Sequence, residues 1–157
     1  MSRRHGFTLL EILLAIVIGM LIISLAVPGV VGMLRQQDLH RTFESFDDFV
    51  HAARSKSVME RRDYIMVFDE AGVTLQPADP KGEDTDTELE RFAFEEGHVY
   101  TLDRPVALMK KPAAQWPFWR SGCCEPVRVL YEGPAGTWVA EYNALTATGA
   151  VVDEIVK

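Results

Sequence analysis

The chain opens with a long apolar run. After it, apolar residues recur first with a helical period of three or four positions and then with a period of two. No charged side chain occurs from residue 12 to residue 34, whereas acidic and basic residues are spread over the remainder. As a helix, a run of this length spans about 35 Å, enough for a hydrocarbon core of ~30 Å. The pattern predicts a transmembrane helix over residues 7–34, preceded by a short basic segment, residues 1–6.

Apolar residues keep a helical period beyond the membrane-length run. They recur every three or four positions, as on one face of an amphipathic helix. These positions are Leu39, Phe43, Phe46, Val50 and Ala53. We therefore expect residues 35–62 to continue the first helix, giving one rod over 7–62. Pro28 removes one backbone hydrogen bond and is predicted to kink that rod.

After residue 63 the period becomes two, which is typical of half-buried strands. The predicted strands are 64–68, 73–76, 92–94, 98–102, 105–109, 127–131, 138–142 and 151–155, with turns at 69–72 and 132–136. Several short strands after one long helix, without a parallel βαβ pattern, predict an α+β fold. In it the long helix packs on an antiparallel, sandwich-like β-rich domain, residues 63–157.

Composition narrows the class of protein. The chain has 157 residues and a net charge of −7, which fits one domain and argues against a general nucleic-acid binder. Two cysteines exclude a disulfide-dense scaffold and a four-cysteine zinc site. The four histidines form no metal pair, and the sequence has no nucleophile elbow or phosphate loop. We expect no enzyme activity, no cofactor and no metal.

A carboxylate stands at the start of the apolar run. Glu11 would cost roughly 2.5–3.5 kcal/mol inside a bilayer, so such a residue usually has a partner. The stretch from Gly6 to Glu11 reads GFTLLE and follows a basic leader. It resembles the N-terminus of type IV prepilins and of type II secretion pseudopilins. In that family a membrane peptidase cuts after the glycine and methylates the new N-terminal amine.

The resemblance implies a role for each matching residue. Residues 1–6 would be a leader peptide, cut between Gly6 and Phe7, and Phe7 would be methylated. Glu11 is then the fifth mature residue and Pro28 the twenty-second, as in many family members. The freed amine of Phe7 would pair with Glu11 of a neighbouring subunit during assembly. The implied partners are other pilins or pseudopilins, prepilin peptidase and the inner membrane.

The basic start also predicts an orientation. Arg3 and Arg4 precede the apolar run and no further cation follows until Arg35, so the N-terminus is expected in the cytoplasm. The protein would be single-pass in the bacterial inner membrane, with residues 63–157 in the periplasm. An ordinary signal peptide is the competing interpretation, because residues 24–26 offer a cleavage site that would leave Val27 first.

A second, weaker resemblance concerns the region after the membrane. Residues 49–57 and the hairpin 64–76 are similar to the H-type minor pseudopilins and to the FimT/FimU kind of pilus subunit. This implies a minor pseudopilin, a structural subunit of the type II secretion pseudopilus that helps to export folded proteins. The alternative is a type IV pilus minor pilin with a role in DNA binding or uptake. Major pilins and G-type pseudopilins stay open.

Residues 104–128 interleave cations with aromatic rings, a mixture that can bind single strands or a protein partner. The candidate contact residues are Lys110, Lys111, Trp116, Trp119 and Arg120. The favoured interpretation is structural, with tryptophans in the core and cations in water. Nucleic acid is therefore not the expected partner.

Two further features are expected to be structural. The loop 77–90 is acidic, but Leu89 stands where a calcium loop of the EF-hand type needs glycine, so a solvated loop is favoured over a calcium site. Cys123 and Cys124 are adjacent, and neighbouring Cα atoms about 3.8 Å apart would strain a disulfide between them. Two alternatives stay open, buried thiols or a bridge between two chains, and no redox function is assigned.

Overall fold

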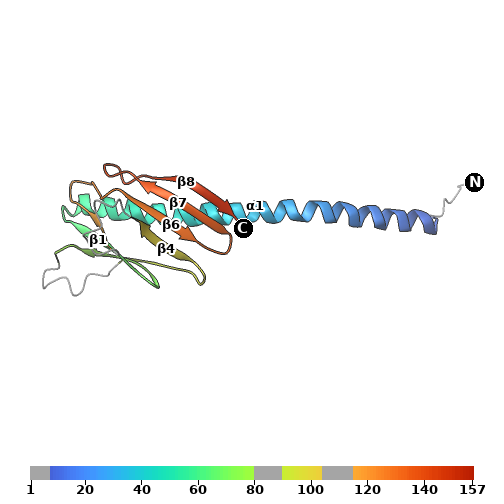
Figure 1. Cartoon of the computed structure of the whole chain (residues 1–157), viewed down its shortest axis with the longest axis horizontal. Helices are drawn as coiled ribbons and strands as arrows, with labels where there is room; N and C mark the ends of the chain where they lie inside the picture. The colour runs from blue at the N-terminus through green and yellow to red at the C-terminus, as the bar shows by residue number, and fades with distance from the viewer. Residues whose placement is uncertain (1–7, 80–89, 104–114) are drawn as a thin grey trace, which may run out of the picture.

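The computed structural model describes residues 8–79, 90–103 and 115–157, with all their side chains except those of residues 25–31. In these ranges one long helix, α1 (Leu9–Met59), precedes a series of strands (Figure 1). The strands are β1 (Tyr64–Asp69), β2 (Gly72–Pro77), β3 (Glu90–Ala93), β4 (Val99–Asp103), β5 (Gln115–Phe118), β6 (Val127–Glu132), β7 (Gly136–Tyr142) and β8 (Gly149–Val156).

The strands form two four-stranded sheets, ordered β3-β2-β1-β5 and β4-β6-β7-β8. Every strand pair in both sheets is antiparallel. Burial alternates along β6 and β7, as expected for strands with one face in a core. The predicted α+β class, a long helix on an antiparallel β-rich domain, is confirmed.

The second half of α1 lies along both sheets, whereas its first half extends beyond them (Figure 1). The apolar stripe predicted from the sequence is the face that packs: Leu39, Phe46, Val50 and Ala53 are at most 1% exposed, and Phe43 packs against them. The ring of Phe46 contacts rings of both sheets, namely those of Phe68, Phe92, Tyr100, Trp138 and Tyr142. One helix face thus closes the core of the whole domain.

Polar contacts fix the same helix to the second sheet. The indole Nε1 of Trp138 donates to Thr42 Oγ1 at 3.0 Å, and the Thr42 hydroxyl donates to the carbonyl of Leu39 at 2.7 Å. The backbone N–H of Gly149 donates to Asp47 Oδ1 at 3.3 Å. These bonds satisfy groups that burial would otherwise leave unpaired, and they set the position of the helix along β7 and β8.

Helix α1 ends at Met59, three residues before the predicted end at residue 62. Arg61 has a φ of 51°, in the left-handed region, and the N–H groups of Arg61 and Arg62 donate back to the carbonyls of Val58 and Ser57. This is a Schellman-type helix end, which usually has glycine where Arg61 stands. The sequence signal was weak because no glycine or proline marks the stop.

The predicted strands match the observed ones with small shifts in their ends, except in two places. The predicted strand 105–109 lies outside the described residues. Strand β5 was missed because Pro117 lies in its middle, and proline weakens a strand pattern. The position of β5 explains why the strand tolerates a proline. β5 is the edge strand next to β1, so the side of Pro117 that lacks an N–H can face away from the sheet.

Removing the Phe46 ring should destabilise the domain more than any exposed change on α1. We expect Phe46→Ala to lower the free energy of unfolding by about 3–5 kcal/mol, because it leaves a cavity between the two sheets. Urea titration of the detergent-solubilised full chain, followed by tryptophan fluorescence, measures this. Asp48→Ala, an exposed position on the same helix, is the control and should stay within ~0.5 kcal/mol of the wild type. Equal stability of the two variants would contradict the packing described here.

Candidate assembly helix and neighbouring surfaces

The first half of α1 presents an apolar surface on every side. Each large apolar side chain between residues 9 and 23 is at least half exposed, from 50% at Ile18 to 83% at Leu9. This part of the helix projects away from the β domain (Figure 1). A helix that is apolar all round requires lipid or other apolar helices as its surroundings. The feature is therefore a contact element rather than part of the domain core.

Glu11 lies in the first turn of α1, where Thr8 caps the helix. The backbone N–H of Glu11 donates to Thr8 Oγ1 at 3.3 Å and to the Thr8 carbonyl at 3.0 Å. Thr8-Leu9-Leu10-Glu11 also has the spacing of a capping box, in which a Glu or Gln three residues after the cap completes it. The carboxylate is exposed and sits at the positive end of the helix dipole. The backbone of Glu11 thus takes part in the helix cap, which the sequence analysis does not predict.

The remaining predicted residues of this segment are described only in part. Gly6 and Phe7 lie outside the described residues. The backbone stays helical through position 28, and the predicted kink at Pro28 stays a prediction. Among the residues that could be assessed, no stretch of helix combines the length and mean hydropathy needed to cross a membrane.

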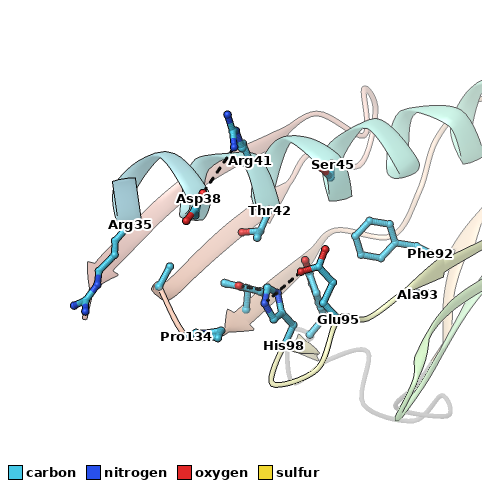
Figure 2. A pocket seen from close by; sticks show the side chains of 13 residues that line it. Arg35, Asp38, Arg41, Thr42, Ser45, Phe92, Ala93, Glu95, His98 and Pro134 are labelled. Carbon is cyan, nitrogen blue, oxygen red and sulfur yellow. Dashed lines mark hydrogen bonds and ion pairs between the residues drawn. The ribbon is translucent and has the colours of Figure 1, made fainter. Parts of the chain in front are cut away.

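A groove of about 790 Å³ runs beside the middle of α1 (Figure 2). Arg35, Asp38 and Arg41 line it from the helix, and Glu95 and His98 line it from the loop before β4. His98 Nδ1 lies 3.0 Å from the hydroxyl of Tyr131, and His98 Nε2 lies 3.8 Å from Glu95 Oε2. Burial raises the pKa of Tyr131, so its hydroxyl stays protonated at neutral pH. The groove is thus lined by charged side chains and by the hydrogen-bonded pair His98 and Tyr131.

Comparison with known proteins supports the N-terminal interpretation. Residues 1–27 match the family model described as the prokaryotic N-terminal methylation motif. This motif covers Gly6, Phe7 and Glu11, the residues on which the resemblance to prepilins rests. A search of curated proteins finds no match.

Among solved structures, the chain is similar to the minor pseudopilin EpsH from the type 2 secretion system of Vibrio cholerae. The match has a TM-score of 0.51 and 13% sequence identity, and it covers 73% of this chain and 95% of that one. At this identity the likeness concerns the fold. The chain thus carries the N-terminal methylation motif and has a pilin-like fold similar to that of EpsH. Both features agree with the resemblance to type IV pilins and pseudopilins found in the sequence.

The basic and aromatic residues of this pilin-like chain do not form one patch. Trp116 is fully buried, and its Nε1 donates to the carbonyl of Glu125 at 2.8 Å. The suggestion that Trp116 contacts a partner was therefore wrong, because its ring packs against Phe118 and Tyr142 in the core. Trp119 and Arg120, by contrast, are exposed. Lys110 and Lys111 lie outside the described residues.

Sequence reasoning missed the residues that lie beside Trp119 and Arg120 in space. Arg61, from the end of α1, lines a hollow of about 390 Å³ together with Arg120. Val58 touches the same turn, since a Cβ added at Gly122 would lie 3.0 Å from its Cγ2. We call Val58, Met59, Arg61, Trp119 and Arg120 the helix-end surface. The two segments are some sixty positions apart in the chain, so no local pattern could connect them.

Metal binding finds no support in the described part of this pilin-like chain, where no three His, Cys, Asp or Glu side chains gather at a metal site. The carboxylates that suggested a calcium loop, Asp84, Asp86 and Glu88, lie outside the described residues. The preference for a solvated loop there stays a prediction.

The two cysteines of the pilin-like chain are free thiols in different surroundings. Cys124 is buried, and its Sγ lies 3.5 Å from the carbonyl of Asn143. Burial, with a smaller contribution from Cys123, raises the pKa of Cys124 to about 11. Cys123 is partly exposed.

This difference predicts selective alkylation. At pH 8 a thiol with a pKa near 11 is only about 0.1% thiolate, so iodoacetamide should modify Cys123 and leave Cys124. Peptide mass spectrometry of the labelled full chain checks this, and both sites should react once the chain is unfolded in urea. Because folding raises this pKa, the native state loses stability as the pH rises from about 9 to 11. Equal labelling of both thiols in the folded chain would show that Cys124 is not buried.

Proposed function

We propose that this chain is a minor pseudopilin, a structural subunit of a type II secretion pseudopilus. The observation that carries the proposal is an N-terminal methylation motif at the head of a 51-residue helix whose first half is apolar and exposed, on a pseudopilin fold. Such a helix can pack with its counterparts in a filament, while the β domain stays outside. We assign it to the H type because the fold is similar to that of the minor pseudopilin EpsH over 95% of that chain.

The N-terminus supplies the pairing that directs assembly in this proposal. Cleavage after Gly6 creates a cationic amine on Phe7, and Glu11 offers the only carboxylate of the apolar run. In a low-dielectric environment opposite charges attract far more strongly than in water, and an unpaired charge is costly there. A new subunit is therefore most stable where its amine meets Glu11 of a neighbour. Prepilin peptidase and other pseudopilins are the partners this requires.

A location in the bacterial inner membrane is part of this proposal, and the apolar segment supports it. Residues 12–34 carry no charge, and the cations Arg3 and Arg4 precede them, which favours a cytoplasmic N-terminus and a periplasmic β domain. The role we propose is mechanical, with no catalytic step and no cofactor. A filament of such subunits would push folded cargo outward as it grows.

A DNA-binding minor pilin is the less favoured function. Of the two tryptophans suggested to stack on bases, Trp116 is buried. The chain as a whole carries a net charge of −7, which repels phosphates.

Leader cleavage is the first test. We expect Gly6→Ala to leave an uncut precursor in the membrane, because the peptidase of this family cuts after glycine. Intact-mass measurement of the membrane-extracted chain distinguishes the precursor from a product that starts at a methylated Phe7. Wild-type protein beginning at Val27 would instead identify an ordinary signal peptide and overturn the proposal.

Substitutions at Glu11 can separate charge pairing from helix capping. Glu11→Gln keeps a capping-box residue but removes the charge, whereas Thr8→Ala removes the cap hydroxyl and keeps the charge. Losing one partner of a desolvated ion pair costs about 2–5 kcal/mol, so Glu11→Gln should reduce filament incorporation roughly thirtyfold or more. Thr8→Ala should incorporate within a few-fold of the wild type. The measurement is the amount of full-length chain in sheared filament fractions.

Both variants must first be cleaved normally, which intact mass verifies. Normal incorporation of Glu11→Gln together with poor incorporation of Thr8→Ala would assign Glu11 to the helix cap and remove the pairing argument.

A further inference from the structure

The helix-end surface contains two guanidinium groups that pair with none of the described residues. Six arginines in the described ranges form a hydrogen bond or an ion pair through their guanidinium group, with a backbone carbonyl or a carboxylate. They are Arg35, Arg41, Arg54, Arg62, Arg91 and Arg128. Arg61 and Arg120 form no side-chain hydrogen bond or ion pair with any described residue. Both line the same hollow at the end of α1. Their charges are available to a second molecule.

The turn that carries Trp119 and Arg120 is fixed by its backbone. Gly122 N donates to the Trp119 carbonyl at 2.8 Å, which closes the turn. From α1, Arg54 Nε donates to the Gly122 carbonyl at 2.8 Å and Ser57 Oγ approaches the Trp119 carbonyl at 3.2 Å. Gly122 has a φ of 83°, in the left-handed region. Two elements distant in sequence are thus joined into one rigid platform.

A further bond orients the next residue of the turn. The backbone N–H of Arg120 donates to Asp63 Oδ1 at 2.8 Å, so this carboxylate accepts a hydrogen bond from the main chain. Arg120 itself is exposed. The backbone is ordered without any partner, so docking here would cost little conformational entropy.

Exposed apolar side chains occur on the same two segments as these cations. At the end of α1, Met59 is 77% exposed and Val58 44%, and on the turn Trp119 is 37% exposed. Tryptophan and arginine are the residue types that most often carry the binding energy of protein interfaces. Two unpaired guanidinium groups beside an exposed indole favour a partner that combines an apolar contact with carboxylates.

We propose that the helix-end surface docks an acidic face of the domain of another pilin-type subunit. This inference rests on the proposed function. The surface lies at the end of the molecule opposite the N-terminus (Figure 1), so in a membrane-anchored filament it faces a subunit farther from the membrane. Carboxylates on that subunit would pair with Arg61 and Arg120 around the indole of Trp119.

A protein partner fits this surface better than single-stranded DNA. Glu60, Asp63 and Asp79 line the same hollow as the two arginines and would repel a phosphate backbone. A protein can place its carboxylates selectively beside the guanidinium groups, whereas a regular chain of phosphates cannot avoid the acidic residues.

Photo-crosslinking in the bacterial host tests the proposal with the full-length chain. With Trp119 replaced by benzoylphenylalanine, we expect irradiation to give one adduct. Mass spectrometry should identify its partner as a protein with an N-terminal methylation motif of its own. Reversing both charges, Arg61→Glu with Arg120→Glu, should reduce the adduct by roughly tenfold or more. Arg41→Glu, an exposed arginine on α1 outside the helix-end surface, is the matched control and should leave the adduct unchanged.

Each other outcome overturns the inference. An adduct that nuclease removes would identify DNA as the partner. An adduct that survives the double reversal, or no adduct from a chain that is cleaved after Gly6 and incorporated, would show that this surface docks no subunit. Protection of Cys124 from alkylation verifies that the reversed variant is folded. Failure of cleavage in the unmutated chain would contradict the proposed function instead, and with it this inference.

Discussion

The burial of one face of α1 between two sheets is the constraint on which the rest of the structure depends. Phe46 contacts rings from both sheets, and Leu39, Val50 and Ala53 extend the buried stripe on either side of it. Neither sheet could bury its inner face without this helix, because the sheets share the core with it. The second half of the helix is therefore part of the domain, and the two are expected to move as one body.

The same helix continues beyond the domain, where no described segment covers it. Between residues 9 and 23 its apolar side chains remain exposed, so the isolated subunit is incomplete. A membrane and then a filament can each provide the missing contacts. Because the apolar surface is nearly uniform, it favours packing against other helices but does not specify their relative position along the helix axis. Glu11 is the exception, and its charge gives the assembly we propose a preferred position.

Aromatic and basic residues of the domain fall into two groups, those that are paired or packed within it and those that are exposed at its surface. Trp116 and Trp138 lie in the core with their Nε1 groups hydrogen-bonded, whereas Trp119 is displayed on a fixed turn. Most arginines in the described ranges are paired there, but Arg61 and Arg120 have no side-chain partner among the described residues. The helix-end surface and the apolar half of α1 thus lie at opposite ends of the molecule, which suits a subunit that contacts different neighbours at each end.

The sequence by itself determined the long helix, its buried stripe, most strands and the processing motif, because each depends on spacing between near neighbours. A period of three or four residues specifies a helix face, and a period of two specifies a strand face. The tertiary structure decided which tryptophan is buried, that Pro117 lies in an edge strand, and that Arg61 and Arg120 line one hollow. Those outcomes depend on contacts between segments far apart in the chain, which local pattern does not encode. Physical packing of α1 against two sheets brings them together.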